Sequence, residues 1–142
     1  MGDTLQTIVD LLKDNWLLGN SDGITPEIDK IYNKKRVGGM TDPVTFIGVY
    51  PHAGANLKPI DLGYNNVSRD EHVSIDIRSS QSHEHLINCE AEARRIINAN
   101  RKTVSGFDVA IVVLSKDISE GTRKFWHWVL EVDLIAYAEA VA

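Results

Sequence analysis

The residues best suited to hold a metal ion are two histidines and a cysteine close together in the chain: His83, His85 and Cys89. On a helix, His85 and Cys89 are four positions apart and therefore share a face. Zinc requires three or four such ligands, and no second cluster of them is visible. Cys89 also falls on an apolar stripe, where a free cysteine behaves as a small hydrophobe. The sequence therefore favours a buried cysteine beside solvated histidines, and predicts no metal and no cofactor.

A metal-dependent nuclease would need clustered carboxylates with a cation nearby. Asp76 and Arg78 provide an acid and a cation on one side of an alternating segment, and Glu84 and Glu90 follow downstream. The same alternation is typical of the solvated side of a half-buried strand. There is neither a Gly-x-Ser-x-Gly nucleophile elbow nor a phosphate-binding glycine loop. We therefore expect no catalytic site, and a nuclease is the third of three functional hypotheses.

The bulk properties indicate one globular domain that covers residues 1–142. Hydrophobic residues make up 43% of the chain and charged residues 25%, close to globular averages. The single cysteine excludes an intramolecular disulfide. A net charge of −5 disfavours tight binding to DNA, because each neutralised phosphate needs a Lys or Arg. No apolar run approaches the ~18 residues that span a bilayer, so we expect no membrane partner.

Two helices are predicted from apolar residues at helical spacing. The first runs from about Leu5 to Trp16, with Gly19 as a stop and a loop to Pro26. The second begins after Ser82, a good N-cap residue, and continues to about Arg101. Each helix must bury one face against the rest of the domain.

The remaining elements read as strands, at 30–36, 44–50, 72–78, 107–116 and 122–137. The nearly continuous apolar run at 107–116 predicts a central strand that is covered on both faces. Alternation at 122–137 turns Trp126 and Trp128 inward, and leaves Phe125 and Tyr137 on the polar side as candidates for a partner interface. We predict an α+β fold, with an antiparallel or mixed sheet of about four to six strands and two helices packed on one face.

Two segments are predicted to be irregular, at 37–43 and 51–69, with a short strand or extended arm as the alternative for part of the second. They contain Gly38, Gly39 and several further glycine, proline and asparagine residues. Long loops in compact domains are commonly working surfaces. The cationic stretch with Lys30, Lys34, Lys35 and Arg36 could touch phosphate or an acidic partner, although a solvated loop is preferred.

The order of these elements over almost the whole chain resembles the tail-terminator or tail-completion (head–tail joining) family of tailed viruses. The resemblance rests on an N-terminal helix, TFIGVY (45–50), a polar excursion, HVSIDIRS (72–79), HEHLINCEAEARRIINANR (83–101), FDVAIVVLS (107–115) and KFWHWVLEVDLIAY (124–137). It implies a non-enzymatic protein of the virion neck, made in the host cytoplasm, that forms a homo-oligomeric ring, commonly a hexamer. The implied partners are the tail tube protein and a head-completion or connector protein, while DNA passes through the ring.

The resemblance also implies contact loops at 37–41 and 52–69. The corresponding interface residues are Lys34, Lys35, Arg36, Gly38, Gly39, Met40, His52, Asn56, Lys58, Tyr64, Asn65 and Arg69. An acidic ring would let DNA pass without adhering to it, because like charges repel. The second hypothesis is a small cellular adaptor domain that binds a protein partner through the same loops.

Overall fold

The computed structural model describes residues 4–30, 45–59, 66–119 and 126–139; for 21, 52–59, 66–69 and 138–139 it describes the backbone alone. Two α-helices, one short 3₁₀ helix and five strands make up this part of the chain. Their bounds are α1 Thr4–Asn15, η1 Leu18–Ser21, β1 Glu27–Lys30, β2 Thr45–Pro59, β3 Asn66–Ser79, α2 His83–Ala99, β4 Val109–Asp117 and β5 Trp126–Glu139.

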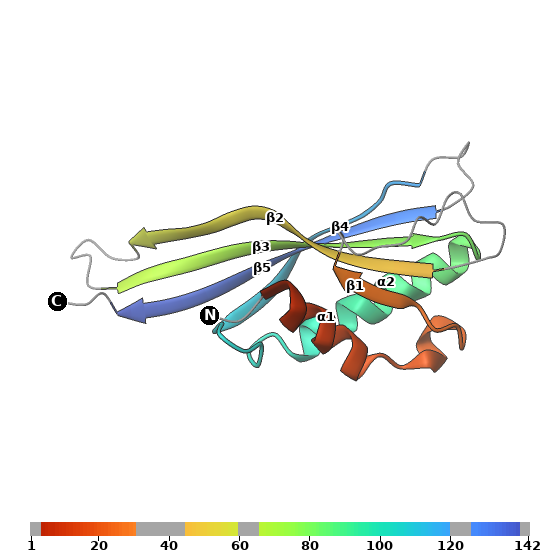
Figure 1. The fold of residues 1–142 in the computed structure, drawn as a ribbon, viewed down its shortest axis with the longest axis horizontal. Helices are drawn as coiled ribbons and strands as arrows, with labels where there is room; N and C mark the ends of the chain where they lie inside the picture. The colour runs from red at the N-terminus through yellow and green to blue at the C-terminus, as the bar shows by residue number, and fades with distance from the viewer. Residues whose placement is uncertain (1–3, 31–44, 60–65, 120–125, 140–142) are drawn as a thin grey trace.

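The five strands form one mixed sheet in the order β1-β2-β3-β5-β4. β1 runs parallel to β2, and the other neighbouring pairs are antiparallel. Both helices lie on the same face of this sheet (Figure 1). The α+β fold with a mixed sheet and two helices on one face is therefore confirmed.

The hydrophobic core lies between that sheet face and the helices. Strands contribute alternate residues to it, since successive side chains point to opposite faces. Its fully buried members include Ile8, Val9, Leu12, Ile47, Val49, Ile75, Ile77, Leu86, Cys89, Ala93, Ile96, Ile97, Leu130, Val132 and Leu134. Burying each large aliphatic side chain stabilises the fold by about 1.5–3 kcal/mol relative to leaving it exposed.

The bounds of α2 follow from its capping residues. The Ser82 hydroxyl accepts a hydrogen bond from the His85 backbone N–H at 3.0 Å, which confirms the predicted N-cap. At the other end, the Asn100 backbone N–H donates to the carbonyls of Ile96 and Ile97. The helix thus ends just before the predicted position at Arg101.

β5 is extended, as its alternation predicts. Leu130, Val132 and Leu134 are fully buried on the helix side of the sheet. Trp126 and Trp128 are partly buried and pack against the same core, and the Trp128 indole N–H donates to the Ser115 hydroxyl at 2.8 Å. The inward orientation of both tryptophans is therefore confirmed.

The prediction of a central strand at 107–116 is wrong. The apolar run forms β4, the last strand in the sheet order, and most of its side chains are exposed. A continuous apolar run is compatible with a strand covered on both faces, but it carries no information about the strand's neighbours. Within β4, Ala110 borders the core, whereas several other aliphatic residues of the strand are exposed.

The prediction of an irregular segment at 51–69 is also wrong for the described residues. β2 continues to Pro59, and its pairing with β3 extends to Pro59 opposite Val67. Register shifts on either side of Ala53 accommodate the glycine-containing sequence in the hairpin. Because β3 pairs with β5 as far as Asn66 opposite Glu139, three strands extend beyond the helices (Figure 1).

The first strand lies earlier than predicted. β1 covers Glu27–Lys30 and pairs in parallel with β2, whereas the sequence predicts a strand at 30–36. The remainder of that range, together with the turn predicted at 37–43, lies outside the described residues. Part of the loop predicted after Gly19 is η1, and the next residue, Asp22, adopts a left-handed conformation with φ of 59°.

Candidate assembly surfaces

The three candidate metal ligands do not converge on one point. The His83 Nε2 atom lies 2.6 Å from Asp117 Oδ2, which links the start of α2 to the end of β4. The His85 Nε2 atom instead lies 3.4 Å from Cys89 Sγ in the core. Burial, together with the charges of Asp22 and Glu92, raises the pKa of Cys89 to about 12. The thiol is therefore protonated at neutral pH, while zinc binds the thiolate.

The described part of the chain contains no group of three or more His, Cys, Asp or Glu side chains placed to hold a metal ion. No helix in these ranges is long and apolar enough to cross a bilayer.

The carboxylates considered for a nuclease lie on different sides of the sheet. Asp76 lies between core residues of β3, so its side chain points away from the helices. It is 3% exposed, and it accepts hydrogen bonds from Arg78 Nε at 3.0 Å and from His127 Nε2. Glu90 lies on α2, across the sheet, and binds Arg94 at 2.9 Å. These acids are engaged with separate partners and do not form one site.

The side of the sheet that faces away from the helices, called the open face below, carries histidine–aspartate pairs between β3 and β5. His72 Nδ1 lies 2.5 Å from Asp133 Oδ1, directly across the two strands. Asp76 and His127 form a second pair further along. Burial, and then the charge of Asp76, raises the pKa of the neighbouring Tyr50. The alternation of β3 predicts which side these residues occupy, but not their partners on β5.

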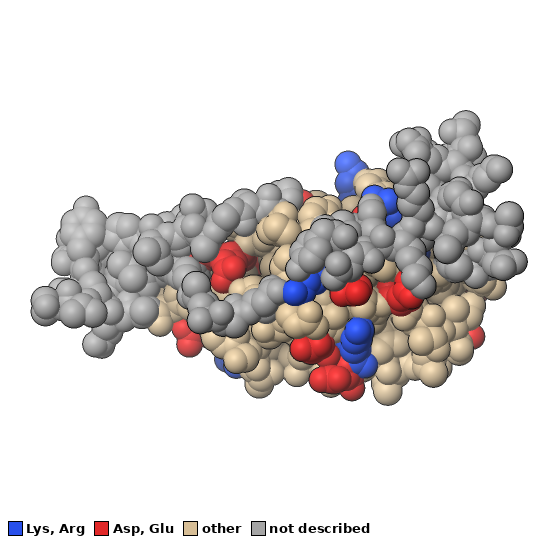
Figure 2. Space-filling view, viewed as in Figure 1, with Lys and Arg blue, Asp and Glu red and all other residues tan. Residues whose placement is uncertain are grey.

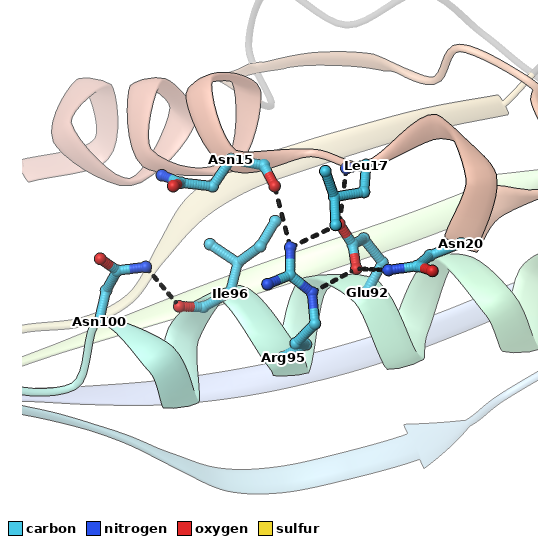
Figure 3. Close-up of polar contacts among 7 residues, drawn as sticks. All are labelled: Asn15, Leu17, Asn20, Glu92, Arg95, Ile96 and Asn100. Atoms are coloured by element: carbon cyan, nitrogen blue, oxygen red, sulfur yellow. Dashed lines mark hydrogen bonds and ion pairs between the residues drawn. The ribbon is translucent and has the colours of Figure 1, made fainter.

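A buried carboxylate joins the two helices (Figure 3). Glu92 on α2 is 1% exposed and accepts hydrogen bonds from the Leu17 backbone N–H at 2.7 Å and the Asn20 side chain at 2.9 Å. Arg95 donates to both Glu92 oxygens, at 2.7 and 2.8 Å, and to the carbonyl of Asn15 at 2.9 Å. These contacts hold the end of α1 and η1 against α2.

The environment of Glu92 stabilises its ionised form. Burial alone would raise the pKa of Glu92, but the hydrogen bonds from Arg95, Asn20 and Leu17 outweigh it and lower the pKa to about 2. Sequence reasoning missed this residue, because Glu92 looks like one more charged residue on a helix. The one signal available is its place beside Ala93 and Cys89 on the buried stripe.

The most conspicuous exposed surface is an apolar strip on β4 and the residue that follows it. The β4 strip consists of Ile111, Val113, Leu114 and Ile118, with side chains 45%, 52%, 41% and 38% exposed. A register shift between Val112 and Leu114 leaves Val113 as an extra residue in the pairing with β5. Exposed apolar patches of this kind mark interaction surfaces. Sequence reasoning missed the strip because it placed these residues in the centre of the sheet.

The structure describes only some of the predicted contact residues. Eight of them lie outside the described residues: Lys34, Lys35, Arg36, Gly38, Gly39, Met40, Tyr64 and Asn65. The other four are strand residues of the long β2–β3 hairpin rather than loop residues: His52, Asn56, Lys58 and Arg69. Phe125 is outside the described ranges, and Tyr137 is 55% exposed on β5. Contact through any of these residues stays a prediction.

Comparison with known proteins gives a match in structure alone. No protein-family model matches the sequence. No curated protein matches it either. Among solved structures, the chain is similar to a chain of the "Virion of native gene transfer agent (GTA) particle", with a TM-score of 0.59 and 10% sequence identity over 92% of both chains. At that identity the similarity shows a shared fold along nearly the full length of each chain.

Proposed function

We propose that this protein is a structural component of a virus-like particle that functions in assembly at the junction of head and tail. The observation that carries the proposal is the fold shared with a virion chain over 92% of both sequences. The shared length is important, because nearly the whole chain corresponds to the neighbour and not just one supersecondary motif. The element order that resembles the head–tail joining family supports the same role.

Within that role, the protein forms a closed ring of identical subunits, commonly six, between the tail tube protein and a head-completion or connector protein. Rings arise when two different surfaces of each subunit meet and the rotation closes. A net charge of −5 suits a lumen through which DNA passes, since an acidic wall releases no counterions on contact. The part of β2, β3 and β5 that extends past the helices gives the subunit a sheet that can reach a neighbour (Figure 1).

The test is the solution mass of the purified protein, measured alone and with the tail tube protein from the same particle. We expect a ring in electron micrographs and a mass several times that of the 15.8 kDa chain. A tail tube protein from an unrelated particle is the control and should not be capped. A protein that stays monomeric with its own tube would contradict the proposal.

A cleavage assay separates this proposal from the nuclease hypothesis. We expect no metal-dependent cleavage of DNA by the purified protein. If cleavage were seen and were lost in Asp76→Asn, the assembly role would have to be replaced by an enzymatic one.

A further inference from the structure

The β4 strip has a basic border. The Ala110 backbone N–H donates to the carbonyl of Arg101 at 2.7 Å, so the turn that carries Arg101 and Lys102 lies at one end of the strip. Lys116 lies within the strip, between Leu114 and Ile118 in sequence, and is exposed. None of the three cations forms an ion pair within the described ranges. The strip is therefore an apolar centre with unneutralised positive charge around it.

The acids near the strip are already engaged by other groups. Asp108 accepts a hydrogen bond from the Tyr137 backbone N–H at 2.6 Å. Asp117 is paired with His83, and Asp133 with His72. Glu131, directly opposite Leu114 on β5, also has a bonding partner. Beside the strip there are thus cations without an ion pair in the described ranges, and acids that are already hydrogen-bonded.

A second exposed apolar surface, called the corner below, lies where α1 meets η1. It consists of Leu17 and Leu18, which are 55% and 45% exposed. The stretch from Thr4 to Lys30 around it holds five carboxylates and two lysines, a net charge of −3. Asp14 and Asp22 are the acids next to it in sequence, and both are exposed; Asp22 accepts a hydrogen bond from the Asn88 side chain at 2.6 Å. The cation beside the corner, Arg95, is balanced by its ion pair with Glu92. In Figure 2, carboxylate side chains lie over the part of the surface where Figure 1 places α1, with Lys or Arg side chains between them.

The strip and the corner belong to different layers of the molecule. The strip is on β4, at one end of the sheet order. α1 packs against β1 and β2, and η1 packs against α2, so the corner lies in the helix layer. Two different surfaces on one subunit are what a head-to-tail contact needs.

We propose that the β4 strip of one copy packs against the corner of the next copy, as the subunit interface of the ring. This inference rests on the proposed function and names the surfaces that would carry it. The apolar centres exclude water from each other, while the basic border of the strip faces the acidic surroundings of the corner. A strip-to-strip dimer would bring Lys116 and Arg101 of two copies together, and a corner-to-corner dimer would bring carboxylates together. Charge therefore favours the contact between unlike surfaces.

The experiment uses one substitution on each surface. Val113→Asp places a carboxylate in the strip, and Leu18→Asp places one in the corner. We expect either variant alone to be monomeric, with association weakened at least about ten-fold, because an unpaired charge is desolvated in the interface. The matched control is Asn98→Asp, a charge added to an exposed position of α2 that belongs to neither surface. The control should assemble like the wild type. Circular dichroism establishes that each variant is folded, and Val113→Ser and Leu18→Ser replace any variant that is not.

A mixture of the two variants gives the decisive result. The intact corner of Val113→Asp can bind the intact strip of Leu18→Asp, but the remaining surfaces both carry a carboxylate and repel. The mixture should therefore contain one-to-one dimers and no rings, as measured by light scattering or native mass spectrometry.

Each other outcome has a distinct meaning. If folded Val113→Asp and Leu18→Asp both form rings, this interface is wrong, while the proposed function stands. A lack of dimers in the mixture would also overturn the unlike contact. If the wild type stays monomeric with its tail tube, the proposed function fails and this inference fails with it.

Discussion

The two faces of the β3–β5 strand pair are stabilised by different interactions. On the helix side, Ile75 and Leu130 are fully buried among other aliphatic side chains. On the open face, the same two strands are joined by the His72–Asp133 and Asp76–His127 pairs. The helix side depends on volume and shape, whereas the open face depends on charge and hydrogen bonding. A period of two in the sequence thus separates two kinds of stabilisation within one strand pair.

β4 extends this comparison to a third environment. Its apolar residues have the composition of the core, yet Ile111 is 45% exposed while Ile75 is 0% exposed. The same residue type, isoleucine, therefore has a different role in each strand. In β3 it stabilises the subunit, and in β4 it is available to another molecule.

The largest effect is expected when two isoleucines are compared directly. Ile75→Ala should lower the free energy of unfolding by about 3–4 kcal/mol, because it removes a large side chain from the core and leaves a cavity. Ile111→Ala should change it by no more than about 1 kcal/mol, because the side chain is half exposed. Chemical denaturation of both variants measures this difference. Equal losses would mean that β4 is covered like β3, which would remove the basis of the comparison.

The next effect concerns the carboxylate that joins the helices. Glu92→Ala should cost about 2–3 kcal/mol of unfolding free energy, since it leaves the Leu17 N–H and the side chains of Asn20 and Arg95 without their acceptor. Glu84→Ala, at an exposed position of the same helix, is the control and should cost well under about 1 kcal/mol. A similar small loss for both variants would mean that the buried contact contributes nothing beyond helix propensity.

The pH dependence of the unfolding free energy should also report on Glu92. Its pKa in the folded protein is about 2, below the ordinary value of 4.5, so its contribution is present above the ordinary value and is lost as the pH falls from there towards about 2. Unfolding measured between about pH 6 and pH 3 should therefore show a steeper loss for the wild type than for Glu92→Gln. Parallel pH dependences would show that the ionised form is not specially stabilised.

The open face offers two pairs of different burial. Asp76→Asn should cost about 1–2 kcal/mol, because Asp76 is 3% exposed and accepts from both Arg78 and His127. Asp133→Asn should cost about 0.5 kcal/mol, because that carboxylate is 30% exposed and its pair with His72 is screened by solvent. Thermal or chemical unfolding of the two variants compares them. The reverse order would show that burial does not set the value of these pairs.

The last prediction concerns the reactivity of the buried cysteine. Cys89 is fully buried and its pKa is raised to about 12, so a thiol reagent should react with it very slowly in the native protein at neutral pH. The same reagent should react at the rate of a free cysteine in denaturant, which provides the control. Fast native labelling would place Cys89 at the surface and reopen the question of a reactive site.

Much of the fold follows from local patterns, and the candidate surfaces do not. The Ser82 N-cap and the stripe through Leu86, Ala93 and Ile97 are local signals that predict α2 closely. The alternation of β5 predicts which of its residues are buried. The pairs on the open face and the contacts of Glu92 join residues far apart in sequence, so no local pattern reveals them. The β4 strip was missed for a related reason, because exposure depends on what lies beside a strand.

The amino-acid sequence by itself determined the type and period of most elements, because helical spacing and strand alternation are properties of the chain within one or two turns. It also indicated that both helices and most strands bury one apolar side in a common core; β4, which is apolar almost throughout, is the exception. Only the tertiary structure decided that β4 lies at the edge, that β1 pairs in parallel with β2, and that 51–59 continues a strand. The physical reason is that strand order and pairing are settled by backbone hydrogen bonds between distant segments, which depend on position rather than on side-chain type.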